Sequence, residues 1–347
     1  MTPKQRVMNI LRGRGADRVP FTTYEFNLRM GGAELTLRNR GVLPEKRTRS
    51  YTIHTPNVNV KTYGYDDNGR HMVKTAFETP YGILTTLTEP KGWTTWNHEY
   101  MFKSPDDYKA LAFMIKDGVV TPDYGPVLRL IKDSGDGALV RDNMPLEPLQ
   151  TIMRGYMGTE AFCYEWMDNR DEVLKLYELV VELNRKTYPV VADGPLEYAN
   201  YGGNVVPQII GSECFVKYYT PNYNEAAEVL HKKGKLIGSH HDSEMGPIMK
   251  ELGETDLDYI EAYDPLCSPP VAEAKKHFGG KTLWINWPSG WQPESRAFKI
   301  ERTLEMLRQA EPGGFIIGIT ENIPDDIWEE HFTAIMDAID IYYNNFR

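Results

Sequence analysis

The stretch from residue 235 to residue 320 decides the fold, because short apolar segments and helical segments alternate along it. Its apolar segments are KLIGSHH (235–241), DYIEAY (258–263), TLWINW (282–287) and GFIIGIT (314–320). The segments between them are MGPIMKEL (245–252), PPVAEAKKHF (269–278) and SRAFKIERTLEMLRQA (295–310), which have helical patterns. Regular alternation of strands and helices predicts a parallel sheet covered by helices.

The same alternation can be followed back to about residue 120. It includes the strand ALVRDN (138–143) and the segment EYANYGGN (197–204), with predicted helices near 122–133, 145–156, 159–167, 170–190 and 212–232 and a final helix near 325–343. We therefore predict an α/β fold, a (β/α)8 TIM barrel, as a single domain over residues 1–347. An open doubly wound sheet is the alternative, but the chain has neither GxGxxG after its first strand nor GxxxxGK[ST].

The N-terminal third departs from this alternation. Residues 2–12 are predicted to form a helix, a short strand is expected around Val19–Phe21, and the Arg-rich residues 22–50 are predicted as helix and loop. Residues 51–103 carry alternating β-branched and aromatic residues, broken at PYG (80–82) and PKG (90–92). This pattern predicts antiparallel hairpins, which we expect to form an insertion near the barrel mouth.

Composition excludes several classes of protein. The net charge is -10, and no long basic run or RNA-binding signature occurs, so a nucleic-acid partner is not expected. No stretch approaches 18 apolar residues and no signal peptide is recognisable, which predicts a cytoplasmic protein without a membrane partner. The three cysteines form no CxxC pair and predict no disulfide framework. Whether the chain forms a homodimer, with or without residues 51–103, stays open.

Over most of its length the sequence resembles the uroporphyrinogen decarboxylase-like superfamily. The resemblance lies in TPKQRVMNILRGRGADRVPF (2–21), in residues 201–253, in residues 261–290 and in GFIIGITENIP (314–324). True decarboxylases of the superfamily carry an Arg-Gln-Ala-Gly-Arg run after the first strand. This chain has TTYEFNLRM (22–30) there, so the resemblance does not extend to porphyrinogen binding.

The methyltransferase branch of the superfamily binds zinc through a His-x-Cys pair and a later Cys. Here His240 and Asp242 stand at the positions of the pair, and Glu321 stands at the position of the later Cys. The resemblance therefore implies these three as catalytic residues and as ligands of a divalent metal, expected to be Zn²⁺, although they also suit Mn²⁺ or Fe²⁺. The alternatives are that His240 only bonds Asp242 or a backbone carbonyl, and that Glu321 caps a helical segment.

Other residues at predicted strand ends are candidates for substrate binding, because these ends form the active site of TIM barrels. They are Asp142, Asn143, Met144, Tyr198, Asn200, Tyr201, Asn204, Glu261, Tyr263, Asn286 and Trp287. The alternative for each is core packing or loop hydrogen bonding. His241 is predicted to pack on the opposite side of its strand. Three roles are open for Cys267: a fourth metal ligand, a reactive thiol, or a loop residue without a catalytic role.

The resemblance implies a function as well as a fold. It implies a methyltransferase, or O-demethylase, that moves a methyl group from a small donor such as a phenyl methyl ether to a corrinoid. No appended corrinoid module is evident, so the corrinoid is expected on a partner protein. The alternatives are a decarboxylase or related lyase for another carboxylated substrate, and a corrinoid- or metal-binding protein without activity. The sequence does not identify the methyl donor.

Overall fold

A computed structural model describes residues 1–92 and 94–345 of the chain. Eight parallel strands close into a barrel in the order β1-β14-β13-β12-β11-β10-β9-β2. They are β1 (Phe21–Tyr24), β2 (Val42–Thr48), β9 (Leu139–Asn143), β10 (Tyr198–Asn200), β11 (Leu236–His240), β12 (Tyr259–Tyr263), β13 (Thr282–Asn286) and β14 (Phe315–Ile319). The predicted (β/α)8 barrel is therefore confirmed, and the open sheet is excluded because β1 pairs with both β2 and β14.

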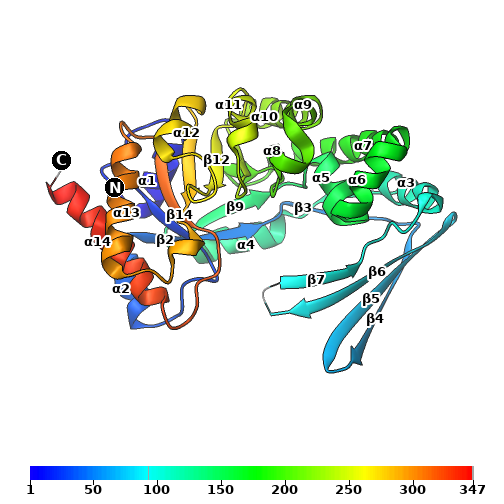
Figure 1. Cartoon of the computed structure of the whole chain (residues 1–347), viewed down its shortest axis with the longest axis horizontal. Helices are drawn as coiled ribbons and strands as arrows, with labels where there is room; N and C mark the ends of the chain where they lie inside the picture. Colours follow the sequence, from blue (N-terminus) through cyan, green and yellow to red (C-terminus); the bar gives the residue numbers. More distant parts are fainter. Residues whose placement is uncertain (93, 346–347) are drawn as a thin grey trace. The chain divides into compact units, whose positions relative to one another are not determined.

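Helices surround the barrel strands in Figure 1. They include α1 (Pro3–Leu11), α2 (Gly32–Arg40), α4 (Tyr124–Ser134), α9 (Pro207–Tyr218), α10 (Thr220–His231), α11 (Met249–Gly253), α12 (Val271–His277), α13 (Arg296–Gln309) and α14 (Trp328–Asn345). The helix α1 starts where the sequence predicts, because Thr2 and Gln5 form a capping box and Pro3 occupies the first turn.

The helix α1 packs against the N-terminal end of the barrel. Its buried residues Val7, Met8, Ile10 and Leu11 join one core cluster with inward-facing residues of the barrel strands. The strand members of that cluster are Leu43, Leu139, Tyr198, Tyr259, Trp284 and Ile316. Apolar burial of this kind stabilises the fold by about 1.5–3 kcal/mol per large side chain. The polar layers of the barrel interior consequently lie toward the C-terminal ends of the strands.

The chain divides into two compact units, and the second comprises Tyr51–Asp123 and Pro145–Val190. It holds an antiparallel sheet of β4 (Asn59–Asp67), β5 (Arg70–Thr79), β6 (Gly82–Lys91) and β7 (Thr94–Glu99), and an antiparallel pair of β3 (Tyr51–His54) with β8 (Val119–Pro122). Its helices are α3 (Tyr108–Lys116), α5 (Pro148–Gln150), a π-helix at Thr151–Met157, α6 (Thr159–Asp168) and α7 (Arg170–Arg185), and α8 (Thr187–Asp193) follows. The antiparallel hairpins are thus confirmed, although Trp93 lies outside the described residues. Their place near the barrel mouth stays a prediction.

One element of the barrel was wrongly predicted as helix and loop. Residues Val42–Thr48 form β2, which pairs in parallel with β1 and β9. Its sequence VLPEKRT lacks apolar alternation because Glu45 lies inside the barrel with 1% of its surface exposed. A buried charged residue is tolerated only with a partner, and a single sequence does not show that partner.

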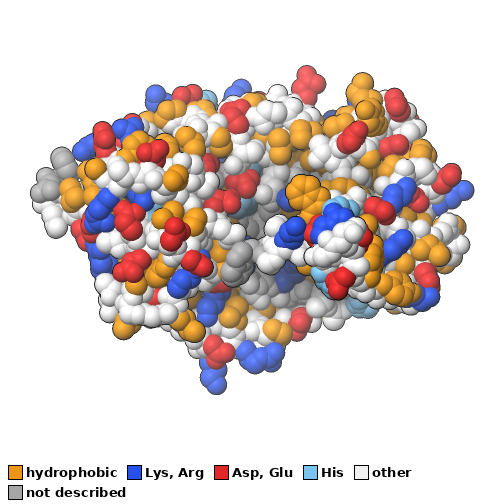
Figure 2. All heavy atoms as spheres, turned by 60° about the horizontal axis from the view of Figure 1, so that its bottom comes forward, with side chains coloured by type: hydrophobic (Ala, Val, Ile, Leu, Met, Phe, Trp, Pro, Cys, Tyr) orange, Lys and Arg blue, Asp and Glu red, His pale blue; other side chains and the backbone are white. Residues whose placement is uncertain are grey.

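Two further features are the hydropathy of the helices and the distribution of charge on the surface. No helix of the described residues is long and apolar enough to cross a membrane. Figure 2 shows acidic and basic side chains interspersed over the face in view, without a large patch of one sign.

Candidate active site

The end of β11 places His240 between two carboxylates. Its Nδ1 lies 2.6 Å from Oε2 of Glu261, on the neighbouring strand β12, and its Nε2 lies 3.2 Å from Oδ2 of Asp242. The hydroxyl of Tyr24, at the end of β1, lies 3.2 Å from the same Nδ1. An imidazole with both nitrogens facing carboxylates donates a proton to each, so this geometry favours the imidazolium form.

Glu261 is the centre of the hydrogen-bond network and has no exposed surface. Its Oε1 accepts from the hydroxyl of Tyr24 at 2.7 Å, and its Oε2 accepts from Nδ2 of Asn200 at 3.0 Å. The strand is irregular directly after it, because Ala262 has φ 64° and the register with β13 shifts there. A β-bulge re-aims the side chains beside it. Glu261 accordingly faces the barrel interior, whereas Tyr263 packs on the outer side against Phe278.

Arg141 connects Glu261 to a second carboxylate deeper in the barrel. Its guanidinium NH1 lies 3.3 Å from Glu261 Oε1 and 3.4 Å from Glu45 Oε2. The hydroxyl of Tyr198 donates to Oε1 of Glu45 at 2.9 Å. Charges therefore alternate in sign along Glu45, Arg141, Glu261, His240 and Asp242, from the barrel interior to its C-terminal mouth. We call these five residues the charge chain.

The charge chain shifts the pKa values of its members in opposite directions. Burial lowers the pKa of His240, but the charge of Glu261 and the hydrogen bonds to Asp242 and Glu261 outweigh burial and raise it to about 10. Burial raises the pKa of Glu261, but His240 and Arg141 more than offset this effect and hold it below its ordinary value. At neutral pH the pair is consequently an imidazolium and a carboxylate.

Two other carboxyl groups have raised pKa values. Burial raises the pKa of Glu45 to about 7, because the charge of Arg141 offsets only part of the desolvation and Glu261 adds repulsion. Burial also raises the pKa of Glu321, the charge of Asp242 raises it further, and His240 opposes both. Glu321 therefore holds a proton at a higher pH than an ordinary glutamate does.

The loop after β10 shapes the other side of the site. Asn204 has φ 56°, a left-handed conformation that asparagine tolerates, and its Nδ2 donates to Oδ2 of Asp242 at 3.1 Å. Gly203 beside it has φ 143°, and a Cβ there would lie 3.0 Å from Cβ of His240. This close approach requires glycine and brings the loop backbone against the imidazole.

Several residues predicted from the sequence come together in this network. Glu261 is itself a member of the charge chain, Asn200 and Asn204 bond directly to other side chains of it, and Tyr198 bonds to its inner end. Asn286 ends β13 and accepts from the backbone N of Thr320 at 3.0 Å. Glu321 responds electrostatically to Asp242 and His240 but, among the described residues, makes no hydrogen bond or ion pair with either.

Other predicted residues lie on the outer face of the barrel. Asp142 accepts from the backbone N of Ser50 at 3.0 Å, and Tyr201 packs edge-on against Tyr223. Trp287 donates from Nε1 to Thr303 on α13 at 2.9 Å. These contacts agree with the alternative to substrate binding that the sequence left open for these residues, which is core packing or loop hydrogen bonding. Met144 is buried as well, and Asn143 ends β9 two residues after Arg141, on the same face of that strand.

His241 and Cys267 lie next to the site, and the structure shows the surroundings of both. His241 is fully buried and packs edge-on against Tyr223, as the sequence predicts, and burial lowers its pKa to about 3. Cys267 is exposed, with its Sγ 3.8 Å from the carbonyl oxygen of Asp242. Partial desolvation of its thiol and the charge of Asp264 raise the pKa of Cys267, which disfavours a reactive thiolate.

Sequence reasoning missed Tyr24, Glu45 and Arg141. The available signal was a charged residue within an apolar strand, as in ALVRDN, which predicts a buried partner but does not name it. Glu45 and Arg141 are 96 positions apart in the chain, and only closure of the barrel brings them together.

The metal ligands implied by the resemblance are not assembled as a cluster. Among the residues that the structure describes, no group of three or more His, Cys, Asp or Glu side chains is placed to hold a metal ion. A metal-bound histidine presents a deprotonated nitrogen to the ion, whereas both nitrogens of His240 face carboxylates. The positions of the two carboxylates favour an ion-paired imidazolium, and metal binding stays a prediction.

Fold and site together define a TIM barrel with a buried charge chain at its C-terminal mouth. The chain is similar in fold to a methyltransferase from Methanosarcina mazei, with 12% identity, a TM-score of 0.60 and 99% of each chain covered. It is less similar to a candidate vitamin-B12-independent methionine synthase from Listeria monocytogenes, with 15% identity and a TM-score of 0.42 over 69% of this chain and 70% of that one. No family model and no curated protein sequence matches the chain.

Proposed function

We propose that this protein is a methyltransferase that moves a methyl group from a small neutral methyl ether to a corrinoid carried by a separate protein. The observation that carries the proposal is the position of His240 between Glu261 and Asp242, which favours a cationic imidazole, at the barrel end where TIM-barrel enzymes have their active sites. The resemblance of the sequence to the methyltransferase branch supports it, and so does the full-length likeness in fold to a methyltransferase.

The charges around His240 favour a neutral donor. Asp242, Asp264 and Glu321 interact electrostatically with one another and form an acidic rim. A carboxylated substrate would meet repulsion from the carboxylates of Asp242 and Asp264, whereas a methyl ether would not, and Glu321 in its protonated form adds no charge to the rim. The rim therefore favours methyl transfer over decarboxylation of a carboxylated substrate, which is the alternative function.

Cleavage of a methyl–oxygen bond leaves the electron pair on oxygen, and that oxygen must gain a proton. Glu321 is suited to supply the proton because burial raises its pKa. The fixed positive charge of His240 would stabilise the developing negative charge on the oxygen. The corrinoid, when bound on its partner, would supply the electron pair for the new bond to the methyl carbon.

A divalent metal is the second means of polarising the donor oxygen. It would be held by His240, Asp242 and Glu321 and would act as a Lewis acid at the same place. Metal binding of this kind requires His240 to lose a proton, and the interaction of His240 with Glu261 opposes that loss.

The direct test is methyl transfer in vitro from guaiacol or veratrole to a reduced corrinoid protein, followed by the absorbance change of the corrinoid. The proposal predicts a methylated corrinoid and one equivalent of demethylated phenol. No transfer across a broad panel of methyl donors would overturn it. Release of CO₂ from a carboxylated substrate without any corrinoid would instead establish the decarboxylase.

A further inference from the structure

The strand β4 forms one edge of the four-stranded antiparallel sheet, and β5 is its only neighbour among the described strands (Figure 1). Eight of its nine residues are exposed, so no other described part of the chain covers this edge. An uncovered edge strand presents a row of backbone N–H and C=O groups with which another strand can pair. The edge is therefore a place where a second polypeptide can bind.

The turn between β4 and β5 determines which residues carry the outward backbone groups. Asn68 and Gly69 have φ of 49° and 76°, which is typical of a two-residue type I′ hairpin turn. The pair that closes such a turn, Asp67 with Arg70, exchanges hydrogen bonds, and bonded and non-bonded pairs alternate from there along the two strands. The even-numbered residues of β4 therefore direct their backbone groups away from β5. These residues are Val60, Thr62, Gly64 and Asp66.

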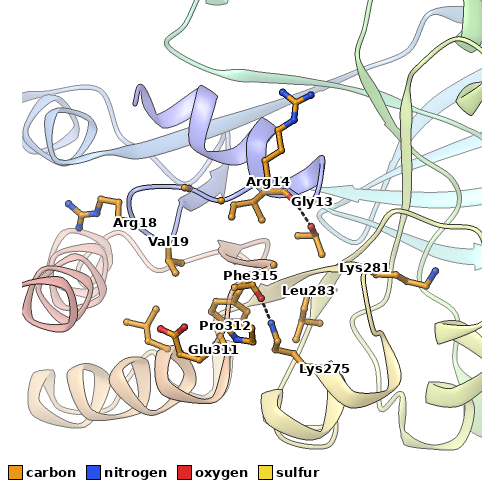
Figure 3. A pocket seen from close by; sticks show the side chains of 18 of the residues that line it. Gly13, Arg14, Arg18, Val19, Lys275, Lys281, Leu283, Glu311, Pro312 and Phe315 are labelled. Atoms are coloured by element: carbon orange, nitrogen blue, oxygen red, sulfur yellow. Dashed lines mark hydrogen bonds between the residues drawn. The ribbon is translucent and has the colours of Figure 1, made fainter. Parts of the chain in front are cut away.

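The outward groups of β4 differ from the polar groups of the cavity at the N-terminal end of the barrel (Figure 3). That cavity has a volume of about 470 Å³. Two of the cations that line it are bonded within the chain, because Lys275 donates to the carbonyl oxygen of Gly313 and Arg18 pairs with Asp340. The outward backbone groups of β4 make no hydrogen bond with any residue that the structure describes outside the sheet.

The edge at β4 also lacks most of the features that protect edge strands, which are short length, proline, bulges and charged side chains. It runs for nine residues in unbroken register with β5 and contains no proline. Its one lysine, Lys61, is paired with Glu78 on β5, with Nζ 2.5 Å from Oε1. The opposite edge, β7, is shorter, and its register with β6 shifts between Leu87 and Thr88. Of the two edges, β4 is the one better suited to accept another strand.

Large apolar side chains on β4 are exposed as well. Val60 is 49% exposed, Tyr63 is 56% exposed and Tyr65 is 45% exposed. Tyr63 and Tyr65 share one face of the sheet with Lys61 and Asp67, because residues two apart in a strand lie on the same face. This face of the edge thus carries a cation, two aromatic rings and an anion in that order along the strand.

We propose that two copies of this chain associate through β4, with the two strands antiparallel and centred on Gly64. The outward backbone groups of Gly64 then bond to those of Gly64 in the second copy. Tyr63 lies opposite Tyr65 of the second copy, and Lys61 lies opposite Asp67 of the second copy, each twice by the two-fold symmetry. Both are non-bonded pairs, in which side chains approach most closely, and aromatic and opposite-charge pairs stabilise such positions.

The order of charges along β4 favours a second copy as the occupant and favours this register. A centre at Tyr63 would place Lys61 opposite Tyr65, and a centre at Tyr65 would place Tyr63 opposite Asp67, so that opposite charges meet in neither. The ammonium of Lys61 has three N–H donors and can bond Asp67 of the second copy while it keeps Glu78. The strand is therefore complementary in charge to itself when the second copy runs antiparallel.

Sedimentation velocity of the full chain over a series of micromolar concentrations tests the proposal. It should show a species with twice the mass of one chain, in equilibrium with the monomer. Thr62→Pro removes an outward N–H, and with it two hydrogen bonds of the symmetric interface, so the dissociation constant should rise at least about tenfold. Thr62→Ala is the matched control, because it loses the same hydroxyl contact with Thr75 but keeps the N–H. It should associate as the unmodified chain does.

A charge exchange tests the register without introducing proline. Lys61→Glu and Asp67→Lys each place like charges opposite one another between two copies of the same variant, so each alone should associate at least about tenfold more weakly than the unmodified chain. Mixed in equal amounts, the two variants bring opposite charges together at both positions and should form a one-to-one heterodimer.

Three results would each overturn the proposal. They are a chain that is monomeric at every concentration, a dimer that neither Thr62→Pro nor Lys61→Glu weakens, and charge variants that do not associate when mixed. The charge exchange decides the matter even if Thr62→Pro does not fold.

Discussion

Nδ1 of His240 and Oε2 of Glu261 lie 2.6 Å apart, on adjacent strands of the closed barrel. Because Glu261 is also bonded by Tyr24, Asn200 and Arg141, its carboxylate cannot turn away from the imidazole without losing those partners. The charge state at the mouth thus depends on residues buried in the barrel interior.

The raised pKa of His240 predicts how stability changes with pH. The folded state keeps this proton up to about pH 10, whereas the unfolded chain loses it near pH 6.5. The stabilisation by His240 is therefore fully present below pH 6.5 and is lost as pH rises toward 10, with a slope of about 1.4 kcal/mol per pH unit for one proton. Urea unfolding at several pH values measures this loss. Between pH 6.5 and 10 the free energy of unfolding should fall more steeply with pH in the unmodified chain than in His240→Gln. Equal slopes would contradict it.

Arg141 should be far more important for stability than its partner Glu45. Arg141→Met leaves the buried Glu45 without its cation and leaves Glu261 with His240 as its remaining cation, which we expect to lower the free energy of unfolding by about 3–5 kcal/mol. Glu45→Gln keeps an acceptor for the Tyr198 hydroxyl and replaces a group whose pKa is already about 7, so its cost should be about 1 kcal/mol or less. Chemical denaturation compares the two variants. A Glu45→Gln variant as unstable as Arg141→Met would show that the carboxylate itself is required.

The sequence predicted the barrel because its strands are apolar and alternate with helices at regular spacing. It also predicted that His240 and Asp242 face one side, since residues two apart in a strand share a face. It did not predict β2, where Pro44, Glu45 and Arg47 hide the strand pattern, nor the link from Glu45 through Arg141 to Glu261. Those contacts depend on barrel closure, and local spacing carries no information about it.

Glu321→Gln should slow methyl transfer by at least about 10²-fold, since a carboxamide cannot supply the proton that a general acid provides. The activity of the unmodified enzyme should fall as pH rises above the raised pKa of Glu321, and the variant should lack this decline. Single-turnover rates across a pH series measure both effects. Glu294→Gln, at an exposed glutamate outside the site, is the control and should behave as the unmodified enzyme. An unchanged rate in Glu321→Gln would remove the acid from the mechanism.

Removal of metal should leave the activity within about twofold if His240 acts as an imidazolium. Elemental analysis of the purified protein, before and after treatment with a chelator, checks this expectation alongside the activity. One metal ion per chain that is lost in both His240→Ala and Glu321→Ala, together with activity restored by Zn²⁺, would contradict the account. That result would favour the alternative mechanism, in which a bound metal polarises the donor oxygen.

The charge of His240 is the central claim, and the ¹⁵N chemical shifts of its ring nitrogens measure it most directly. In protein labelled at histidine, with His240→Gln to assign the signals, we predict that both nitrogens of His240 are protonated at pH 8. His241 provides an internal reference, because it should remain neutral at pH 5, well above its pKa of about 3. A neutral His240 at pH 8, titrating near 6.5 as a free histidine does, would contradict the account.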